Sequence, residues 1–513
     1  MRSVFFAPLL LAATTAAAAA QTPAPAGGTT LHLTVDEAVE MALDQNLDLA
    51  AERLDPAIGD TRVAAAAGAF KPAITSSVQR SNQLAPPASF LVPVATSTDV
   101  VTSNVGLSQQ LPRFGTSYSL AWNTTHTNSD SFLNSYNPLL QSGLSLSVSQ
   151  PLIRNFLVDN ARTQLKVSRT NRDIADTRLK ETLVLTTAAV KATYWNLVSA
   201  RATVGARRTA LDLAEELARV NRAKVEVGQS PPLDEVSAQA EVAADQEQLI
   251  IAETSVKLAE DRLRMLIFDP TRREIWNIAI DPVDEPPSAT TPVDVEAAVS
   301  NALGHRTDIL RAQKDVDNAD VNVKFAGNQR LPDVRVNASY QASGLGGTQI
   351  LRSGGFPGTI VGPGEITPFG SVVDQLFRSQ YPTWTAGVSV AYPIGQSAED
   401  AAYARTRLER TQTGERVKST EARAIQDVRT AGWNIEMNAK RIETTRAARA
   451  LAEQRLDAER KRFEVGMSTS FLVIQAQRDL SQATTNELAA VLAYDLALVE
   501  FDAVQQAPPA AAR

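Results

Sequence analysis

The sequence of 513 residues contains no cysteine and only three histidines. The absence of cysteine excludes disulfides, thiol catalysis and a lipid anchor on cysteine. With so few histidines and no cysteine, we expect neither a metal site nor a cofactor. The net charge of −7 argues against nucleic-acid binding, which needs a basic surface. No nucleophile elbow and no glycine-rich phosphate loop are found, so we do not expect an enzyme.

Long apolar runs are also missing. Beyond the first residues, the chain has no stretch of about twenty apolar residues that would form a membrane helix. Residues 1–20 have the pattern of a secretory signal peptide, in which Arg2 precedes the apolar run Val4–Leu11 and small residues end at Ala20. We therefore expect an exported chain that begins near Gln21. Such a protein is periplasmic, secreted or a β-barrel of the outer membrane.

Proline is absent from two long stretches, Asn160–Val227 and Gln396–Val465. Both stretches are rich in alanine, leucine, glutamate, lysine and arginine, which favour helix. At about 1.5 Å per residue, each stretch predicts a helix roughly 100 Å long, far longer than a globular core needs. Both end in Glu-Val-Gly, at Gly228 and Gly466, and glycine in this position stops a helix.

The two long stretches are copies of each other. The sequence offset between Gly228 and Gly466 also relates Trp195 to Trp433. A constant offset over such a length indicates an internal duplication. The predicted organisation is a signal peptide at 1–20, a first repeat at 21–268, a connector at 269–292, a second repeat at 293–506 and a disordered tail at 507–513.

Between the helices, apolar residues recur with a period of two. Leu144, Leu146 and Val148, for example, alternate with serine. One apolar and one small polar face is typical of outer-membrane barrel strands, although a strand of a soluble sandwich alternates in the same way. The signal peptide and the adjacent long helices favour the barrel. The expected strands are 73–80, 103–111, 116–124 and 143–150 in the first repeat, and 334–340 and 386–392 in the second, with a loop at 341–382.

These elements predict a fold that is mainly α with a membrane β-barrel. So few strands cannot close a barrel alone, and lipid does not tolerate open strand edges. The chain must therefore share its barrel with copies of itself, and cyclic symmetry is the usual solution. The helices have small alanines for close packing and polar residues around much of their surface, as the wall of a water-filled tube requires.

At the two helix ends, the sequence resembles the TolC family of outer-membrane efflux channels. The matching segments are KVEVGQSPPLDEVSAQAEV and RFEVGMSTSFLVIQAQRDL, together with QPLIRN after a strand and YWNLVSA inside the first long helix. The resemblance implies a homotrimer with a β-barrel in the outer membrane and an α-barrel that extends into the periplasm. It also implies a passive duct that docks to a periplasmic adaptor and, through it, to an inner-membrane pump.

In this family the helix tips would dock to the adaptor. The docking residues expected from the resemblance are Val227, Gly228, Ser230, Val465, Gly466 and Ser468. Family members usually close the periplasmic end with acidic residues after the second tip, but the corresponding Leu472 and Gln475 are uncharged here.

Carboxylates follow the first tip instead, at Asp234 and Glu235. Three copies of this pair would form an acidic pore constriction that favours cations. The alternative is that both are helix-start acids favoured by the helix dipole after a proline pair.

The first repeat departs from the family, which has two strands per repeat and twelve in the shared barrel. The four candidate strands of this repeat leave two possibilities. Either the barrel is larger, or the additional hairpin lies outside it. A second function also remains open for the whole chain, that of an exported structural or adhesive helical bundle without channel activity.

Overall fold

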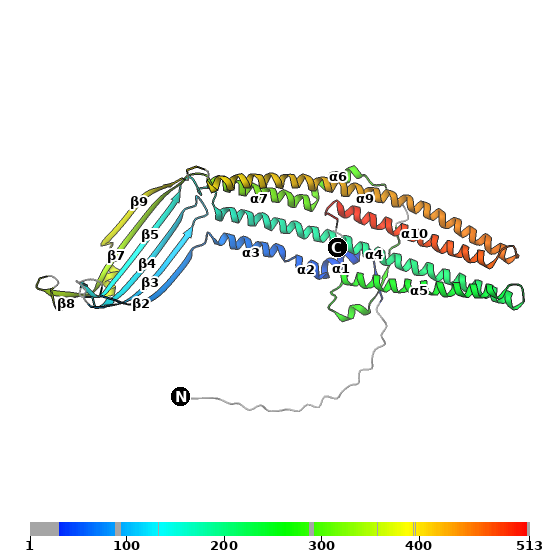
Figure 1. Cartoon of the computed structure of the whole chain (residues 1–513), viewed down its shortest axis with the longest axis horizontal. Coiled ribbons are helices and arrows are strands. Elements are labelled where there is room, and N and C mark those ends of the chain that lie inside the picture. The colour runs from blue at the N-terminus through cyan, green and yellow to red at the C-terminus, as the bar shows by residue number, and fades with distance from the viewer. Residues whose placement is uncertain are drawn as a thin grey trace, which may run out of the picture.

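The computed structural model describes residues 30–87, 94–131, 133–286, 292–355, 358–392, 394–395 and 397–509. Its strands gather at one end of a long molecule, and its helices run from them to two turns at the other end (Figure 1). This is the predicted fold class, mainly α with a β part. The expected signal peptide at 1–20 and the end of the expected tail lie outside the described residues.

Two helices of equal length form the frame. Helix α4 covers Asn160–Glu226 and helix α9 covers Ala398–Glu464, each of 67 residues. Their N-caps are Asp159 and Ser397, whose side chains accept a hydrogen bond from the third helical amide. The first and last residues of α9 follow those of α4 by the same number of residues that separates Gly466 from Gly228. The two long helices are therefore confirmed, and they are equivalent in each repeat.

Shorter helices complete a wall that is four helices wide. In the half toward the tips, α5 (Pro232–Ile267), α4, α10 (Ser470–Val504) and α9 lie side by side (Figure 1). In the half toward the sheet, α3 (Asp55–Gly68) and α7 (Thr307–Gln329) take the places of α5 and α10. The edges of the wall are thus α9 on one side and α3 with α5 on the other.

The helices that precede each group of strands are broken rather than continuous. Residues 35–68 form three helices, α1 (Val35–Gln45), α2 (Leu47–Glu52) and α3, and the side chain of Thr34 caps α1. Residues 295–329 are likewise divided, into α6 (Val295–His305) and α7. Arg306 lies at the second break, where its buried guanidinium donates to Asp308 and Asp427, at 3.0 and 2.7 Å.

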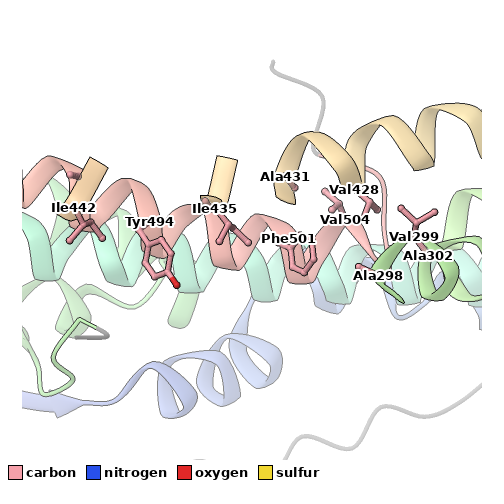
Figure 2. Close-up of a cluster of buried hydrophobic side chains, with 12 residues drawn as sticks. Ala298, Val299, Ala302, Val428, Ala431, Ile435, Ile442, Tyr494, Phe501 and Val504 are labelled. Atoms are coloured by element: carbon pink, nitrogen blue, oxygen red, sulfur yellow. The ribbon is translucent and has the colours of Figure 1, made fainter. Parts of the chain in front are cut away.

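The cores lie where the short helices meet the long ones. One core joins α6, α9 and α10 through Val299, Ile435, Tyr494 and Phe501 (Figure 2). The equivalent core of the first repeat contains Tyr194, whose hydroxyl donates to the carboxylate of Asp284 at 2.9 Å. Burial raises the pKa of Tyr194 to about 12, so this hydroxyl stays protonated at any physiological pH.

A small sheet closes the core of the first repeat. Strand β1 (Thr30–Leu33) pairs in parallel with β6 (Ala279–Pro282), which follows the short 3₁₀ helix Arg273–Asn277. The expected connector 269–292 therefore contains a strand, which sequence patterns do not reveal because strands of four residues are too short to show a period of two. None of the described helices has an apolar stretch of the length and hydropathy that a membrane span requires.

The main sheet has seven antiparallel strands in the order β2-β3-β4-β5-β7-β8, and β9 pairs with the first half of β7. All six expected strands are present, and each is longer than predicted. The strands are β2 (Ala73–Ala85), β3 (Thr96–Gln110), β4 (Ser117–Ser129), β5 (Tyr136–Pro151), β7 (Asp333–Ser353), β8 (Thr359–Thr367) and β9 (Tyr381–Ala391).

The predicted loop at 341–382 is wrong. Strand β7 continues to Ser353, and β8 and helix α8 (Phe369–Phe377) follow it. The glycines that suggested a loop allow close packing instead, since a Cβ on Gly344 or Gly346 would overlap Val372 of α8. Helix α8 therefore packs against β7 around Gly344 and Gly346.

Asp495 offers a test of the core of the second repeat. It is buried in α10 beside Tyr494, and among the described residues its Oδ1 has no hydrogen-bond partner. Burial raises the pKa of Asp495 from 3.8 to about 7. Between these values the unfolded chain is ionised while the folded chain holds the proton, so stability falls as the pH rises from about 4 to 7.

Asp495→Asn removes this penalty because an amide cannot ionise. We expect the melting temperature of the variant to exceed that of the wild type at pH 8 and to match it near pH 4. The control is Asp212→Asn, on the exposed surface of α4. An equal shift at both pH values would contradict the proposed ionisation.

Candidate functional site at the helix tips

The two tips have the same backbone geometry. After α4, the amide of Gln229 donates to the carbonyl of Lys224 at 2.7 Å and that of Gly228 to Val225 at 3.0 Å. This is the Schellman arrangement, which needs a left-handed residue, and Gly228 has φ of 74°. The second tip repeats both bonds from Met467 and Gly466, and Gly466 has φ of 79°. The predicted glycine turns are thus confirmed.

The tips are held to each other by polar contacts between the repeats. Asn221 of α4 is fully buried and donates to the hydroxyl of Ser470 in α10 at 2.6 Å. Lys224 donates to the carbonyl of Phe463 at 3.1 Å, with its ammonium 3.6 Å from the centre of the Phe463 ring. The tips therefore form one surface rather than two independent hairpins.

That surface exposes several apolar side chains. Val227 and Val465, both predicted docking residues, are about 70% exposed, and Met467 is 78% exposed. Ser230 and Ser468 are half-buried, and Ser468 donates to Glu459 at 2.7 Å. The large exposed side chains on either side of the turns were not predicted, and these are Leu233, Met467 and Phe471. A run of apolar exposed residues at helix ends is the signal that could have found them.

Asp234 and Glu235 lie in the first turn of α5, as both the constriction and the helix-start interpretations require. Consecutive helical residues point about 100° apart, so the two carboxylates face different directions. Glu235 accepts a hydrogen bond from Gln239 at 3.0 Å. Asp234 is on the same side of α5 as the buried Ala238 and Glu241, because these residues follow it by four and seven. Their role in a pore constriction stays a prediction.

The helix after the second tip carries its carboxylate one turn further on. Gln475 donates to Asp479 at 2.9 Å, and Arg455 of α9 donates to the same carboxylate at 2.7 Å. Leu472, at the other position where the family has acids, is exposed. The charge that is absent at Gln475 is therefore present at Asp479, but it is neutralised by an arginine.

A charged cluster lies between the repeats, about two helical turns from the tip of α5. Glu241 is buried and accepts two bonds from Arg478 of α10, one from Nε at 2.9 Å and one from Nη2 at 2.5 Å. The cluster borders a cavity of about 410 Å³ that also includes Asp245. Burial, and then the neighbouring Glu241, raise the pKa of Asp245, whereas the bond to Glu241 raises the pKa of Arg478. No local pattern in the sequence indicates this pairing of α5 with α10.

The described residues contain no group of three or more acidic or histidine side chains placed to hold a metal ion. The tips thus combine exposed apolar side chains with a set of carboxylates.

The family comparison identifies the class of protein. The model of the outer membrane efflux protein family matches residues 102–267 and 298–504. The chain therefore belongs to the outer membrane efflux protein family, whose members are channels rather than enzymes. Its place is the outer membrane, with an extension into the periplasm. A search of curated proteins found no match.

Solved structures of outer-membrane channels share the fold. The CmeC channel of Campylobacter jejuni has 14% identity and a TM-score of 0.66, over 92% of this chain and 85% of that one. VceC of Vibrio cholerae has 15% identity and a TM-score of 0.62, over 92% and 96%. The open state of MtrE of Neisseria gonorrhoeae has 16% identity and a TM-score of 0.62, over 92% and 89%.

The constriction hypothesis predicts a change in ion selectivity. The double variant Asp234→Asn and Glu235→Gln keeps size and removes charge. If the carboxylates surround the pore, cation preference falls, and the reversal potential in a salt gradient shifts toward zero. Conductance need not rise, because the passage stays as narrow.

The matched control is Asp212→Asn, which removes one exposed carboxylate from α4, about four turns before its end at the first tip. Reversal potentials that are equal in the wild type and the double variant would end the constriction hypothesis. They would leave Asp234 and Glu235 as helix-start residues that stabilise the tip.

Proposed function

We propose that this protein is, as a homotrimer, the passive outer-membrane exit duct of a tripartite efflux or type I secretion system. Its tips would dock to a periplasmic adaptor, which joins it to an inner-membrane pump that supplies the energy. The observation that carries the proposal is that both edges of the helical wall are apolar and uncovered in the single chain.

Helix α9 has an exposed apolar stripe along one edge of the wall. Its members are Leu408, Trp433, Met437 and Leu451, each more than half exposed. At about 100° per residue, all four point in nearly the same direction, although they span most of the helix. The buried residues of α9, among them Val428 and Ile442, point to the opposite side. Helix α9 is thus built to pack on both flanks, and one flank has no neighbour within the described chain.

Helix α5 has the corresponding stripe at the other edge. Its exposed apolar residues Val236, Ile250, Leu258 and Met265 fall within about a quarter of the helix circumference. The buried residues of α5, such as Ala238 and Ile267, again lie on the opposite side. Two complementary edges on one chain give a head-to-tail interface, and rotation by a constant angle closes it into a ring.

The closed ring explains why polar side chains occupy the remaining two faces of the helices. In a tube, the inner and outer faces of each helix meet water, and only the flanks pack. The alternative, an exported structural or adhesive bundle, would bury its apolar stripes within one chain or against a foreign partner. It would produce no conducting pore.

A single charge on the α9 stripe tests the ring. Leu451→Glu places a carboxylate in the proposed interface, where it would lose its hydration without gaining a partner. We expect the variant to lose the trimer in native mass spectrometry and to lose single-channel conductance in planar bilayers, while its helical content remains.

Ala450→Glu is the matched control, since Ala450 is also exposed but points about 100° away from Leu451. It should retain both the trimer and the conductance. A wild-type protein that is monomeric, or a trimer that never conducts, would refute the duct and favour the structural bundle.

The tips should cross-link to the adaptor. Because the chain has no cysteine, a single cysteine in place of Ser230, Met467 or Ser468 gives a unique site. With a photoreactive thiol reagent on intact cells, we expect one heterologous product, identified by mass spectrometry as an adaptor with a helical hairpin. A cysteine in place of Glu443, exposed on α9 far from the tips and off its apolar stripe, is the control. Cross-linking from position 443 but from none of the tip positions would contradict tip docking.

A further inference from the structure

We propose that three copies of this chain close an eighteen-strand barrel whose lumen is uncharged and about as wide as the helical tunnel. Bulky hydrated solutes of either charge would then pass the membrane without further selection. The inference rests on the proposed duct and deepens it, since it assigns the sorting of solutes to the helical part alone.

The additional hairpin lies inside the sheet and not beside it. Strands β3 and β4 lie between β2 and β5, and β3 pairs with β2 and β4 over thirteen residue pairs each. The first half of β7 then continues the sheet from β5 to β9. Six strands of one chain therefore run side by side, where the family has four.

The register aligns apolar side chains across all six strands on one face. One row joins Ile74, Leu107, Leu120, Leu146, Tyr340 and Trp384, each directly opposite the next. The next row contains Val105, Trp122 and Leu144. Continuous apolar rows on exposed strands suit the lipid side of a barrel. Because the rows include β3 and β4, these strands face lipid in the same way as the others.

The opposite face carries hydroxyls and amides. One row joins Ala73, Ser108, Ser119, Ser147, Ser339 and Thr385, and another joins Gln110, Ser117, Ser149, Asn337 and Gly387. Many of these side chains line a hollow of about 630 Å³, which also reaches the end of α3. We assign this hollowed face, which is opposite the apolar rows, to the lumen.

Neighbouring side chains in the lumen bond to one another. The hydroxyl of Ser149 donates to Asn337 at 2.8 Å, and those of Ser339 and Thr385 are 2.6 Å apart. Among the paired residues of the six strands on this face, charge occurs only where the sheet joins the helices, at the ion pair of Arg335 with Asp333. A lumen lined in this way neither concentrates nor excludes ions by charge.

At a typical strand tilt, the widths of the two layers match with six strands. Four helices at about 9–10 Å between axes span roughly 36–40 Å of the wall. Six strands at about 4.8 Å, tilted by about 40°, span roughly 38 Å, whereas four would span only about 25 Å. The sheet therefore continues the helical wall without narrowing. A ring of three gives a barrel radius of about 18 Å, against about 12 Å for twelve strands.

The contact that closes the barrel would join the two edge strands of the sheet. Among the described strands, β2 and β9 each have a neighbour on one side only, and every residue of β9 is exposed. Unpaired backbone groups cannot remain in lipid, so β9 of one copy would pair with β2 of the next. The barrel is thus incomplete without the partner copies.

Spin labels on β5 test the strand number. Cysteines in place of Ser147 and Leu146, in two separate variants, put labels on opposite faces of one strand. In each variant, the measured distance is that between equivalent labels in two copies of the chain. One label points inward and the other outward, so averaging the two distances cancels the contribution of the label's length. From the radii above, pulsed electron spin resonance of the trimer should give an average of about 31 Å for eighteen strands and about 21 Å for twelve. The Leu146 distance should be the longer, because this residue faces lipid.

Deletion of residues 96–129 provides the matched control. It removes β3 and β4 and leaves β2 and β5 antiparallel, with Ile74 opposite Leu146 on the same face. In this variant the average distance should fall toward about 21 Å, the value for twelve strands. Its pore in planar bilayers should exclude polymers that enter the wild-type pore.

A conducting wild-type trimer with the shorter average distance, that of twelve strands, would overturn the eighteen-strand barrel and leave the duct intact. A longer distance from Ser147 than from Leu146 would overturn the assignment of the lumen. Failure of the duct itself would be recognised separately, since no trimer would form or no current would flow.

Discussion

Every layer of this molecule is an open arc whose two edges must be covered. The sheet ends in strands with unpaired backbone groups, and the helical wall ends in the apolar stripes of α9 and α5. In lipid, the open strand edges can be covered only by closing the sheet into a barrel, because each unsatisfied backbone group there costs several kcal/mol. In water, the apolar stripes at the edges of the helical wall are covered by packing against a neighbouring copy, which buries their apolar area. Since one chain supplies both edges of both layers, a single rotation closes the sheet and the wall together.

The long helices and their glycine turns could be predicted from the sequence because those features are local. A proline-free run and a Glu-Val-Gly end determine helix and turn within a few residues, and Gly228 and Gly466 adopt the expected left-handed backbone. Duplication then strengthened each local signal. The strands were identified by their period of two, but their ends were not, since serine and threonine continue the ladder beyond the apolar rows.

Features that depend on distant residues escaped prediction. Gly344 and Gly346 have the character of a loop, whereas they make room for Val372 of α8. Glu241 and Arg478 lie 237 residues apart, and only the packing of α5 with α10 brings them together. The break between α6 and α7 lies at Arg306, whose two carboxylate partners include one from another helix. The exposed stripes are recognisable only once it is known which helices form the edges of the wall.

The distribution of charge suggests where such a duct selects its cargo. The face of the sheet that we assign to the lumen carries hydroxyls and amides, whereas the helical part carries carboxylates and arginines, and those nearest the tips include Asp234, Glu241, Arg478 and Asp479. A charge acts on a passing ion only within about 8–10 Å at physiological ionic strength. In a tube as wide as the barrel, wall charges would barely reach the axis. In the constriction proposed at the tips they would, which is where Asp234 and Glu235 lie.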